Sequence, residues 1–111
     1  MNIQTEKQEN ALIFRLEGRF DAYEVPALTK LIESEMKDGN KVLVGNLSGV
    51  NFIDSSALAG LVQFMKRSRQ AGGDLHLCEL QQPVRIIFEL TRLDKAFEIH
   101  PLEADALAAL G

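Results

Sequence analysis

The sequence predicts one α/β domain over residues 1–111, a small mixed β-sheet with an N-terminal antiparallel hairpin and about four packed helices. Three observations lead to this fold class. The chain opens with two short runs of strand character that lie close enough to pair as a hairpin. After residue 25, segments with helical spacing alternate with short apolar segments, an order typical of parallel crossovers. Finally, 111 residues with 46% hydrophobic side chains are sufficient for a single core.

The predicted hairpin comprises residues 2–7 and 12–17. The first run is polar except for Ile3, as expected of a strand at the edge of a sheet. In the second run apolar side chains occupy alternate positions, which predicts a strand with one well-buried face. Residues 9–10 are predicted to form the turn between the two runs. The Gly-Arg-Phe-Asp segment at residues 18–21 is predicted to interrupt the second strand.

A first helix is predicted to begin near residue 25 and to stop at Gly39. Pro26 suits the first turn of a helix, where its missing N–H costs least, and Gly39 suits the C-terminal end. The apolar residues that recur at helical spacing are Val25, Leu28, Leu31, Ile32 and Met36. Residues 41–47 follow. Because positions 42–44 are apolar in succession, we expect a strand in the middle of a sheet covered on both faces.

A second helix is predicted over residues 55–70, where Gly72-Gly73 stops it. A strand follows at residues 75–78, and Pro83 opens a third helix. A short strand is predicted at residues 97–99 and an alanine-rich helix at residues 102–110. The side chains expected to face the core from the second and third helices are Leu58, Leu61, Val62, Met65, Val84, Ile87 and Phe88.

Charge and composition exclude several functional classes. The net charge of −4 gives no electrostatic reason to expect direct binding to nucleic acid, which usually requires a basic surface. No stretch approaches the ~20 apolar residues that a membrane-spanning helix needs. Residues 1–10 are polar and lack the apolar segment of a signal peptide, and Cys78 has no second cysteine with which to form an internal disulfide. We therefore expect a cytoplasmic protein that does not insert into a membrane.

The most informative segment is residues 48–60. The expected order is a buried strand, a Ser48-Gly49 turn, two apolar anchors at residues 52–53, and then Asp54-Ser55-Ser56 at the start of a helix. Asp and Ser are ordinary N-cap residues, so capping alone explains them. A phosphate would also be accommodated there, because unpaired N–H groups and the positive end of the helix dipole lie at a helix N-terminus. Both interpretations remain open at this point.

One face of this predicted helix carries Ser56, Gly60 and Gln63 at positions i, i+4 and i+7. Small side chains there would allow a partner to approach the backbone closely. A glycine inside a helix costs up to ~1 kcal/mol relative to alanine, so Gly60 requires a packing or functional reason. Close packing against another element of the same domain explains it equally well.

Other candidate sites are weaker. Asp21 and Asp54 could form a carboxylate pair for acid–base catalysis, but Asp21 is also a plausible turn or N-cap residue, with Glu24 placed as in a capping box. No glycine-rich phosphate-binding loop is present. We therefore expect no enzymatic activity and no cofactor.

Metal binding and cysteine chemistry are not expected either. His76, His100 and Cys78 are too few, and too irregularly spaced, for a recognisable metal site. Cys78 lies in an apolar strand and is expected to be a small buried hydrophobic residue. Arg85, Arg92 and Lys95 are expected to be solvated surface residues.

Taken together, these residues resemble the STAS domain, and in particular the single-domain anti-sigma-factor antagonists of bacteria. The resemblance covers essentially the whole chain. Its markers are the Gly-Arg-Phe-Asp segment at residues 18–21, Asn-Leu-Ser-Gly-Val at 46–50, Phe-Ile-Asp-Ser-Ser at 52–56, Gly-Gly at 72–73, and residues 88–99, with the sequence FELTRLDKAFEI. The Ile-Asp-Ser-Ser motif at a helix start is the most specific of these.

The resemblance implies a phosphorylation switch. In proteins of this kind, the hydroxyl directly after the aspartate, here Ser55, is phosphorylated by an anti-sigma factor that is itself a serine kinase. The unphosphorylated form binds that kinase and so releases the sigma factor, and a metal-dependent serine phosphatase restores this form. By the same resemblance, Asp21 and Asp54 flank the phosphorylation site and Ser56 lies beside it. Ala57 departs from the family, which usually has glycine there, and this leaves the identity of the partner open.

Two further expectations concern the oligomeric state and an alternative function. The chain is expected to be a monomer that dimerises weakly. An alternative function within the same fold is a scaffold or transport-associated STAS subunit that has no phosphate cycle. A hydroxyl directly after Asp54 favours the switch over this alternative.

Overall fold

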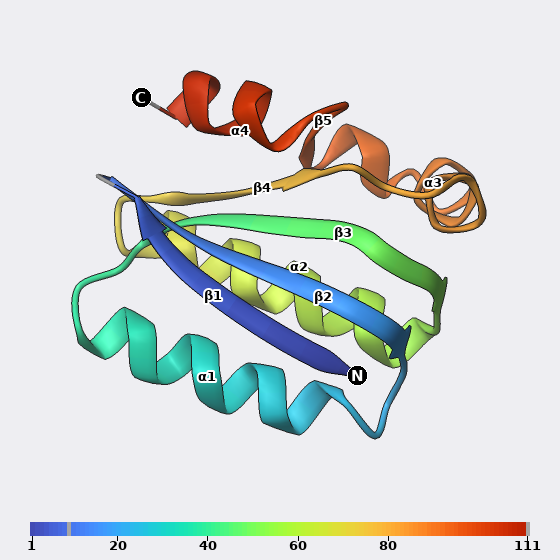
Figure 1. Ribbon diagram of the computed structural model, residues 1–111, viewed down its shortest axis with the longest axis horizontal. Helices are drawn as coiled ribbons and strands as arrows, with labels where there is room; N and C mark the ends of the chain where they lie inside the picture. Colours follow the sequence, from blue (N-terminus) through green and yellow to red (C-terminus); the bar gives the residue numbers. More distant parts are fainter. Residues whose placement is uncertain (9, 111) are drawn as a thin grey trace.

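The computed structural model describes residues 1–8 and 10–110, and over these residues it shows a five-stranded sheet and four α-helices (Figure 1). The elements are β1 (Asn2–Gln8), β2 (Ala11–Phe20), α1 (Val25–Lys37), β3 (Val42–Ile53), α2 (Ser55–Gln70), β4 (Asp74–Cys78), α3 (Gln82–Leu90), the 3₁₀ helix η1 (Leu93–Lys95), β5 (Glu98–His100) and α4 (Glu103–Leu110). Half of the predicted turn at residues 9–10, namely Glu9, lies outside the described residues.

The predicted mixed sheet is confirmed. The strands lie in the order β1-β2-β3-β4-β5, with β1 antiparallel to β2 and the other pairs parallel. The edge position of β1 and the limits of α2 are as predicted. The last strand lies one residue later than expected, at Glu98–His100, because Phe97 turns into the core, where it is 4% exposed.

The predicted ends of β2 and β3 are wrong. Residues 18–20 continue β2, and Ser48-Gly49 does not form a turn but lies inside β3. The register between the two strands shifts twice, because β3 carries one extra residue opposite residues 15–17 and another opposite residues 18–19. Gly18 has a φ of +116°, and a Cβ on Gly49 would lie 2.8 Å from the Cα atom of Glu17. These two glycines permit β-bulges where the alternation of side chains is lost.

Helices cover both faces of the sheet. α1 and α2 lie together on one face, and α4 lies on the other (Figure 1). The main core joins strand residues to α1, α2 and α3, whereas a smaller cluster joins Ile13, Val44 and Cys78 to Ala106 of α4. The prediction of a single buried face for β2 is therefore wrong, because α4 also covers part of the second face and buries Ile13 completely.

A polar network fastens α4 to the sheet. The Arg15 guanidinium donates from Nε and Nη2 to the two carboxylate oxygens of Glu103, each at 2.9 Å, and from Nη1 to Glu6 at 2.9 Å. The side-chain amide of Asn46 also donates to Glu103, and Glu79 accepts a hydrogen bond from the Glu103 backbone N–H. The hydrogen bonds from Arg15 hold the pKa of Glu103 below its usual value. This network places an arginine in a strand and fixes the first turn of α4.

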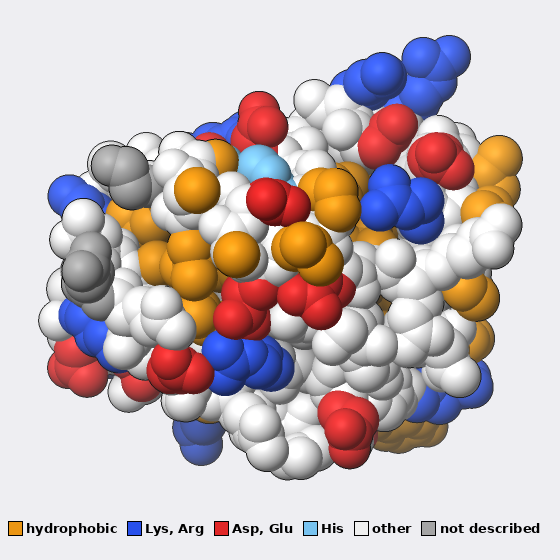
Figure 2. Space-filling view, turned by 45° about the horizontal axis from the view of Figure 1, so that its top comes forward, with side chains coloured by type: hydrophobic (Ala, Val, Ile, Leu, Met, Phe, Trp, Pro, Cys, Tyr) orange, Lys and Arg blue, Asp and Glu red, His pale blue; other side chains and the backbone are white. Residues whose placement is uncertain are grey.

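Around α4 the surface is mixed. Acidic, basic and apolar side chains are interspersed on this face of the molecule (Figure 2). None of the helices in the described part of the chain combines the length and apolarity needed to cross a membrane.

Candidate functional site

The start of α2 is organised by Asp54, not by the serines that follow it. Asp54 is the N-cap residue, with φ −105° and ψ 178°, and its Oδ1 accepts a hydrogen bond of 2.9 Å from the Ala57 N–H. Ser55 and Ser56 are exposed, and neither hydroxyl makes a side-chain hydrogen bond within the described residues. Because the Asp54 side chain supplies the N-cap hydrogen bond, the Ser55 hydroxyl is not needed to cap the helix.

Asp54 also holds the neighbouring loop. Its Oδ2 accepts a hydrogen bond of 2.9 Å from the Ala22 N–H, and its own backbone N–H donates to the carbonyl of Phe20 at 3.3 Å. The hydrogen bond from Ala57 is the main cause that keeps the pKa of Asp54 below its usual value, and the Ala22 N–H and the charge of Arg19 act in the same direction. One ionised carboxylate therefore joins the loop between β2 and α1 to the first turn of α2.

Asp21 is a turn residue of that loop. Its Oδ1 accepts from the Tyr23 N–H at 3.1 Å, and its carbonyl accepts from the Glu24 N–H at 3.0 Å. The predicted capping box is wrong: α1 begins after Glu24, which caps it without a side-chain hydrogen bond, because Asp21 closes a separate turn before the helix. Both candidate catalytic carboxylates, Asp21 and Asp54, are thus engaged with backbone N–H groups of one loop. Tyr23 projects from this loop and is 91% exposed.

A cation next to the site was not predicted from the sequence. The guanidinium of Arg19 lies 3.5 Å from the centre of the Phe52 ring, and its Nε is 3.2 Å from Asp21 Oδ2. Phe52 was expected to anchor the chain in the core together with Ile53, but only Ile53 is buried. The two β-bulges explain the difference, since they place Arg19 directly opposite Phe52. Without the bulged register, the sequence carries no signal for this pair.

The outer face of α2 agrees only in part with the prediction. Ser56 and Gln63 are exposed, as their spacing indicates. Gly60 is partly buried, and a Cβ built on it would lie 3.4 Å from Cγ1 of Val25 in α1, an ordinary contact distance. Gly60 therefore packs against α1, but this contact leaves room for a methyl group and does not require glycine. Ala57 is completely buried in the main core, so its methyl group is not part of the exposed surface beside Ser55.

A shallow apolar depression follows the loop along α1. It has a volume of about 760 Å³ and is lined by Val25, Pro26, Thr29 and Lys30, among others. Together with the exposed Tyr23 ring, it adds apolar surface on the side of the loop from which α1 begins.

The residues that were considered as metal ligands lie on other elements: His76 and Cys78 are in β4, and His100 is in β5. His76 Nδ1 is 3.0 Å from His100 Nε2, a contact that was not expected from the sequence. Cys78 is buried as expected, and burial raises the pKa of its thiol to about 12. No group of three or more His, Cys, Asp or Glu side chains suited to holding a metal ion occurs within residues 1–8 and 10–110.

Comparison with known proteins agrees with this arrangement. The family model described as STAS domain matches residues 2–106. An anti-sigma-B factor antagonist of Staphylococcus aureus is 26% identical over 100 residues, which cover 90% of this chain and 93% of the relative. An anti-sigma F factor antagonist of Paenibacillus polymyxa is 28% identical over 113 residues, covering 99% and 97%. The crystal structure of an anti-sigma factor antagonist from Mycobacterium paratuberculosis superposes with a TM-score of 0.88 at 28% identity, covering 98% and 92%.

Proposed function

The chain belongs to the STAS domain family, and on that premise we propose that it is an anti-sigma-factor antagonist controlled by phosphorylation of Ser55. In the proposed cycle the unphosphorylated chain binds an anti-sigma factor with serine kinase activity and so releases a sigma factor. Phosphorylation of Ser55 ends the binding, and a metal-dependent serine phosphatase restores it. The observation that carries the proposal is the exposed Ser55 hydroxyl, which is left free because Asp54 caps α2.

The relatives support the regulatory half of this proposal. Two bear the name of antagonists of anti-sigma factors, and the alignments run over nearly the whole of each chain. A partner of the same class is therefore the natural expectation for this chain. We expect the chain itself to act in the cytoplasm, without a cofactor, as a monomer or weak homodimer.

The chemistry of the helix start supports the phosphorylated state. A phosphoserine carries nearly two negative charges at neutral pH, and a helix N-terminus stabilises an anion. At Ser55 the phosphate would lie next to the ionised Asp54, on a surface that also exposes Tyr23, Ser56 and Gln63. A partner that makes close contact there would have to bury this added charge beside a carboxylate that is already ionised, which is unfavourable. The fold itself would not need to change.

A pull-down from host lysate tests the proposal. The baits are the Ser55→Ala and Ser55→Asp proteins, with Ser56→Ala and Ser56→Asp as matched controls, and the retained proteins are identified by mass spectrometry. We expect the Ser55→Ala protein to retain a serine-kinase-like ATPase and the Ser55→Asp protein to lose it. Both Ser56 variants should retain it.

The opposite results are equally clear. Retention of the same transporter or scaffold subunits by both Ser55 variants would reject the switch in favour of a STAS scaffold. Loss of the kinase with Ser56→Asp but not with Ser55→Asp would move the phosphorylation site to Ser56.

A further inference from the structure

Helix α3 carries apolar side chains on two faces, and the domain buries only one of them. Val84 and Phe88 point inward and are buried, and Ile87 is partly buried beside them. On the outward face, Ile86 is 43% exposed and Leu90 is 79% exposed. A helix that is apolar on nearly all sides is normally buried on all sides. The outward face of α3 is therefore unusual for the surface of a domain.

The exposed apolar residues of α3 form a continuous stripe. Pro83, Ile86 and Leu90 are spaced at i, i+3 and i+7, which places them on one side of the helix, and all three are exposed. We call these three residues the outer stripe. Of the four large apolar side chains that the described residues leave exposed, two belong to it. Single exposed leucines are common, but neighbouring ones on one helix face mark an interaction surface. In Figure 1, α3 lies at one end of the molecule, where another chain can approach it.

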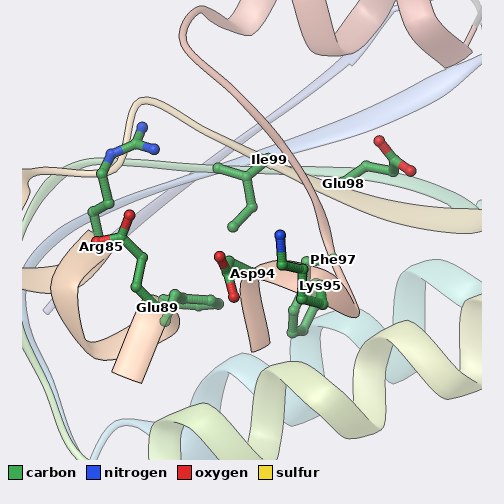
Figure 3. A pocket seen from close by; sticks show the side chains of 8 residues that line it. Arg85, Glu89, Asp94, Lys95, Phe97, Glu98 and Ile99 are labelled. Atoms are coloured by element: carbon green, nitrogen blue, oxygen red, sulfur yellow. The ribbon is translucent and has the colours of Figure 1, made fainter. Parts of the chain in front are cut away.

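Opposite charges flank the outer stripe along one side. Arg85 directly precedes Ile86, and Glu89 directly precedes Leu90. Figure 3 shows the Arg85 and Glu89 side chains projecting from the same side of α3. Within the described residues, neither side chain takes part in an ion pair. A pair between them along the helix would be weak, so both charges remain available to a partner.

We propose that the outer stripe is the interface of a symmetric dimer, in which α3 packs antiparallel on α3 of a second copy of the chain. About the two-fold axis, Ile86 contacts the partner's Leu90, and Leu90 contacts the partner's Ile86. The same axis brings Arg85 to the partner's Glu89 and Glu89 to the partner's Arg85. The surface is therefore complementary to itself in polarity and in charge, as a two-fold interface requires. The proposal gives a location to the weak homodimer expected above, and it does not rest on phosphorylation of Ser55.

The order of the charges favours a second copy over a partner of one charge. A purely acidic surface would attract Arg85 and repel Glu89, and a purely basic surface would do the reverse. An antiparallel copy matches both, because the two charges exchange places across the axis. Stable interfaces bury at least about 1,200 Å² in total, which is more than one face of a nine-residue helix supplies. The dimer should therefore be weak, with a Kd of about 0.1–1 mM.

NMR on the full chain tests whether the dimer forms and where. Translational diffusion and ¹H–¹⁵N shifts are measured between about 20 µM and about 1 mM, a range that brackets the expected Kd. We expect slower diffusion at high concentration, with concentration-dependent shifts confined to residues 82–92. Leu90→Ser should abolish both effects. Leu102→Ser, a matched change at an exposed leucine outside α3, should leave them unchanged. Both leucines are exposed, so neither change disturbs the core.

An exchange of charges tests the antiparallel arrangement. Arg85→Glu and Glu89→Arg should each weaken self-association about tenfold, because each places two pairs of like charges across the axis. An equimolar mixture of the two variants should associate nearly as well as the wild type, since both pairs in the mixed dimer join opposite charges. Mixing Glu89→Arg with Lys66→Glu is the matched control. Lys66→Glu makes the same change of charge on the exposed face of α2 and should not restore association to this extent.

Three results would each overturn the proposal. The first is a wild-type protein that stays monomeric at about 1 mM, above the expected Kd. The second is self-association of Leu90→Ser equal to that of the wild type, which would place the contact on another surface. The third is a mixture of Arg85→Glu and Glu89→Arg that associates no more tightly than either variant alone. None of these results bears on the pull-down with the Ser55 variants, so the two proposals fail separately.

Discussion

The Asp54 carboxylate accepts hydrogen bonds from two backbone segments that are far apart in the sequence. One comes from Ala22 in the loop before α1, and the other from Ala57 in the first turn of α2. Sequence reasoning offered capping as one interpretation of this segment, because an aspartate before two serines is a strong local signal, and the structure identifies Asp54 as the N-cap residue. It did not predict the bond to Ala22, since that contact depends on how β2 and β3 end side by side.

Replacing Asp54 by alanine should loosen both segments at once. We expect Asp54→Ala to lower the urea midpoint and to shift the NMR resonances of residues 22 and 57, because both N–H groups lose their acceptor. Asp54→Asn should retain part of the stability, since an amide still offers one oxygen. Asp105→Ala, a change at an exposed aspartate in α4, serves as the control. If Asp54→Ala affected only residue 57, the proposed link to the loop would be wrong.

Two glycines should respond in opposite ways to a methyl group. A Cβ at Gly49 would lie 2.8 Å from the Glu17 Cα and from the Leu16 carbonyl oxygen, whereas one at Gly60 would meet Val25 at 3.4 Å. We expect Gly49→Ala to destabilise the fold by about 1–3 kcal/mol, because backbone atoms cannot move aside easily. Gly60→Ala should stabilise it by up to ~1 kcal/mol through helix propensity. Urea unfolding of both variants checks this, and equal effects would contradict it.

At the scale of the elements, the helices were easier to predict than the bulged strands. Proline, glycine and helical spacing predicted α1, α2 and α3 closely, because these signals are local. In β3, the residues that belong to the main core are Leu43, Leu47, Val50 and Ile53, so from Leu47 onward the core positions recur every third residue. Each bulge adds one residue, and the expected period of two disappears. A turn was therefore predicted where the strand continues.

The pairing of β4 with β5 includes a contact between two histidines. His76 is 7% exposed; its Nδ1 faces His100 Nε2 at 3.0 Å and its Nε2 lies 3.3 Å from Asp74 Oδ2. Burial lowers the pKa of His76 below the usual 6.5, and the charge of His100 acts in the same direction. The carboxylates of Asp74 and Glu98 oppose this shift.

The free energy of unfolding should therefore fall as the pH drops below about 6.5. In that range the unfolded chain takes up a proton at His76 that the folded chain resists, so acid favours the unfolded state until the lower folded pKa is reached. Urea unfolding between pH 8 and 5 measures the effect. His76→Gln should remove most of this slope between pH 8 and 5, because Asp74 and Glu103, whose pKa values are lowered, contribute only at lower pH. An unchanged slope in His76→Gln would contradict the assignment.

At the scale of the whole molecule, the site forms where the ends of two strands lead into the helix layer. β2 and β3 end together at one edge of the sheet, and the chain then enters α1 from one strand and α2 from the other (Figure 1). The order of elements, the hairpin and Ser55 at a helix start could all be predicted from local pattern and family resemblance. The Arg19–Phe52 contact, the meeting of His76 with His100 and the burial of Ala57 could not, since they depend on tertiary packing.

Phosphorylation should change the surface without changing the fold. With phosphoserine incorporated at position 55, we expect NMR shift changes confined to residues 19–24 and 52–60, because Asp54 continues to cap α2 and the core residues do not contact the new group. Thermal unfolding should still be one cooperative transition. Phosphoserine at position 56 is the matched control. Shift changes throughout the core would show that the switch acts by unfolding instead.

The two bulges of β3 should also limit how this segment varies among related proteins. The residues without a partner in β2 include Ser48 and Asn51, which are exposed, so their side chains are free to change. The number of residues in this segment, in contrast, is not free to change. Removing one residue between Leu47 and Ile53 would turn an apolar side chain out of the core and would advance Asp54 and Ser55 by one position relative to Phe20. Homologues that keep the site should therefore tolerate substitutions here but not insertions or deletions, and length in this stretch should vary less than sequence.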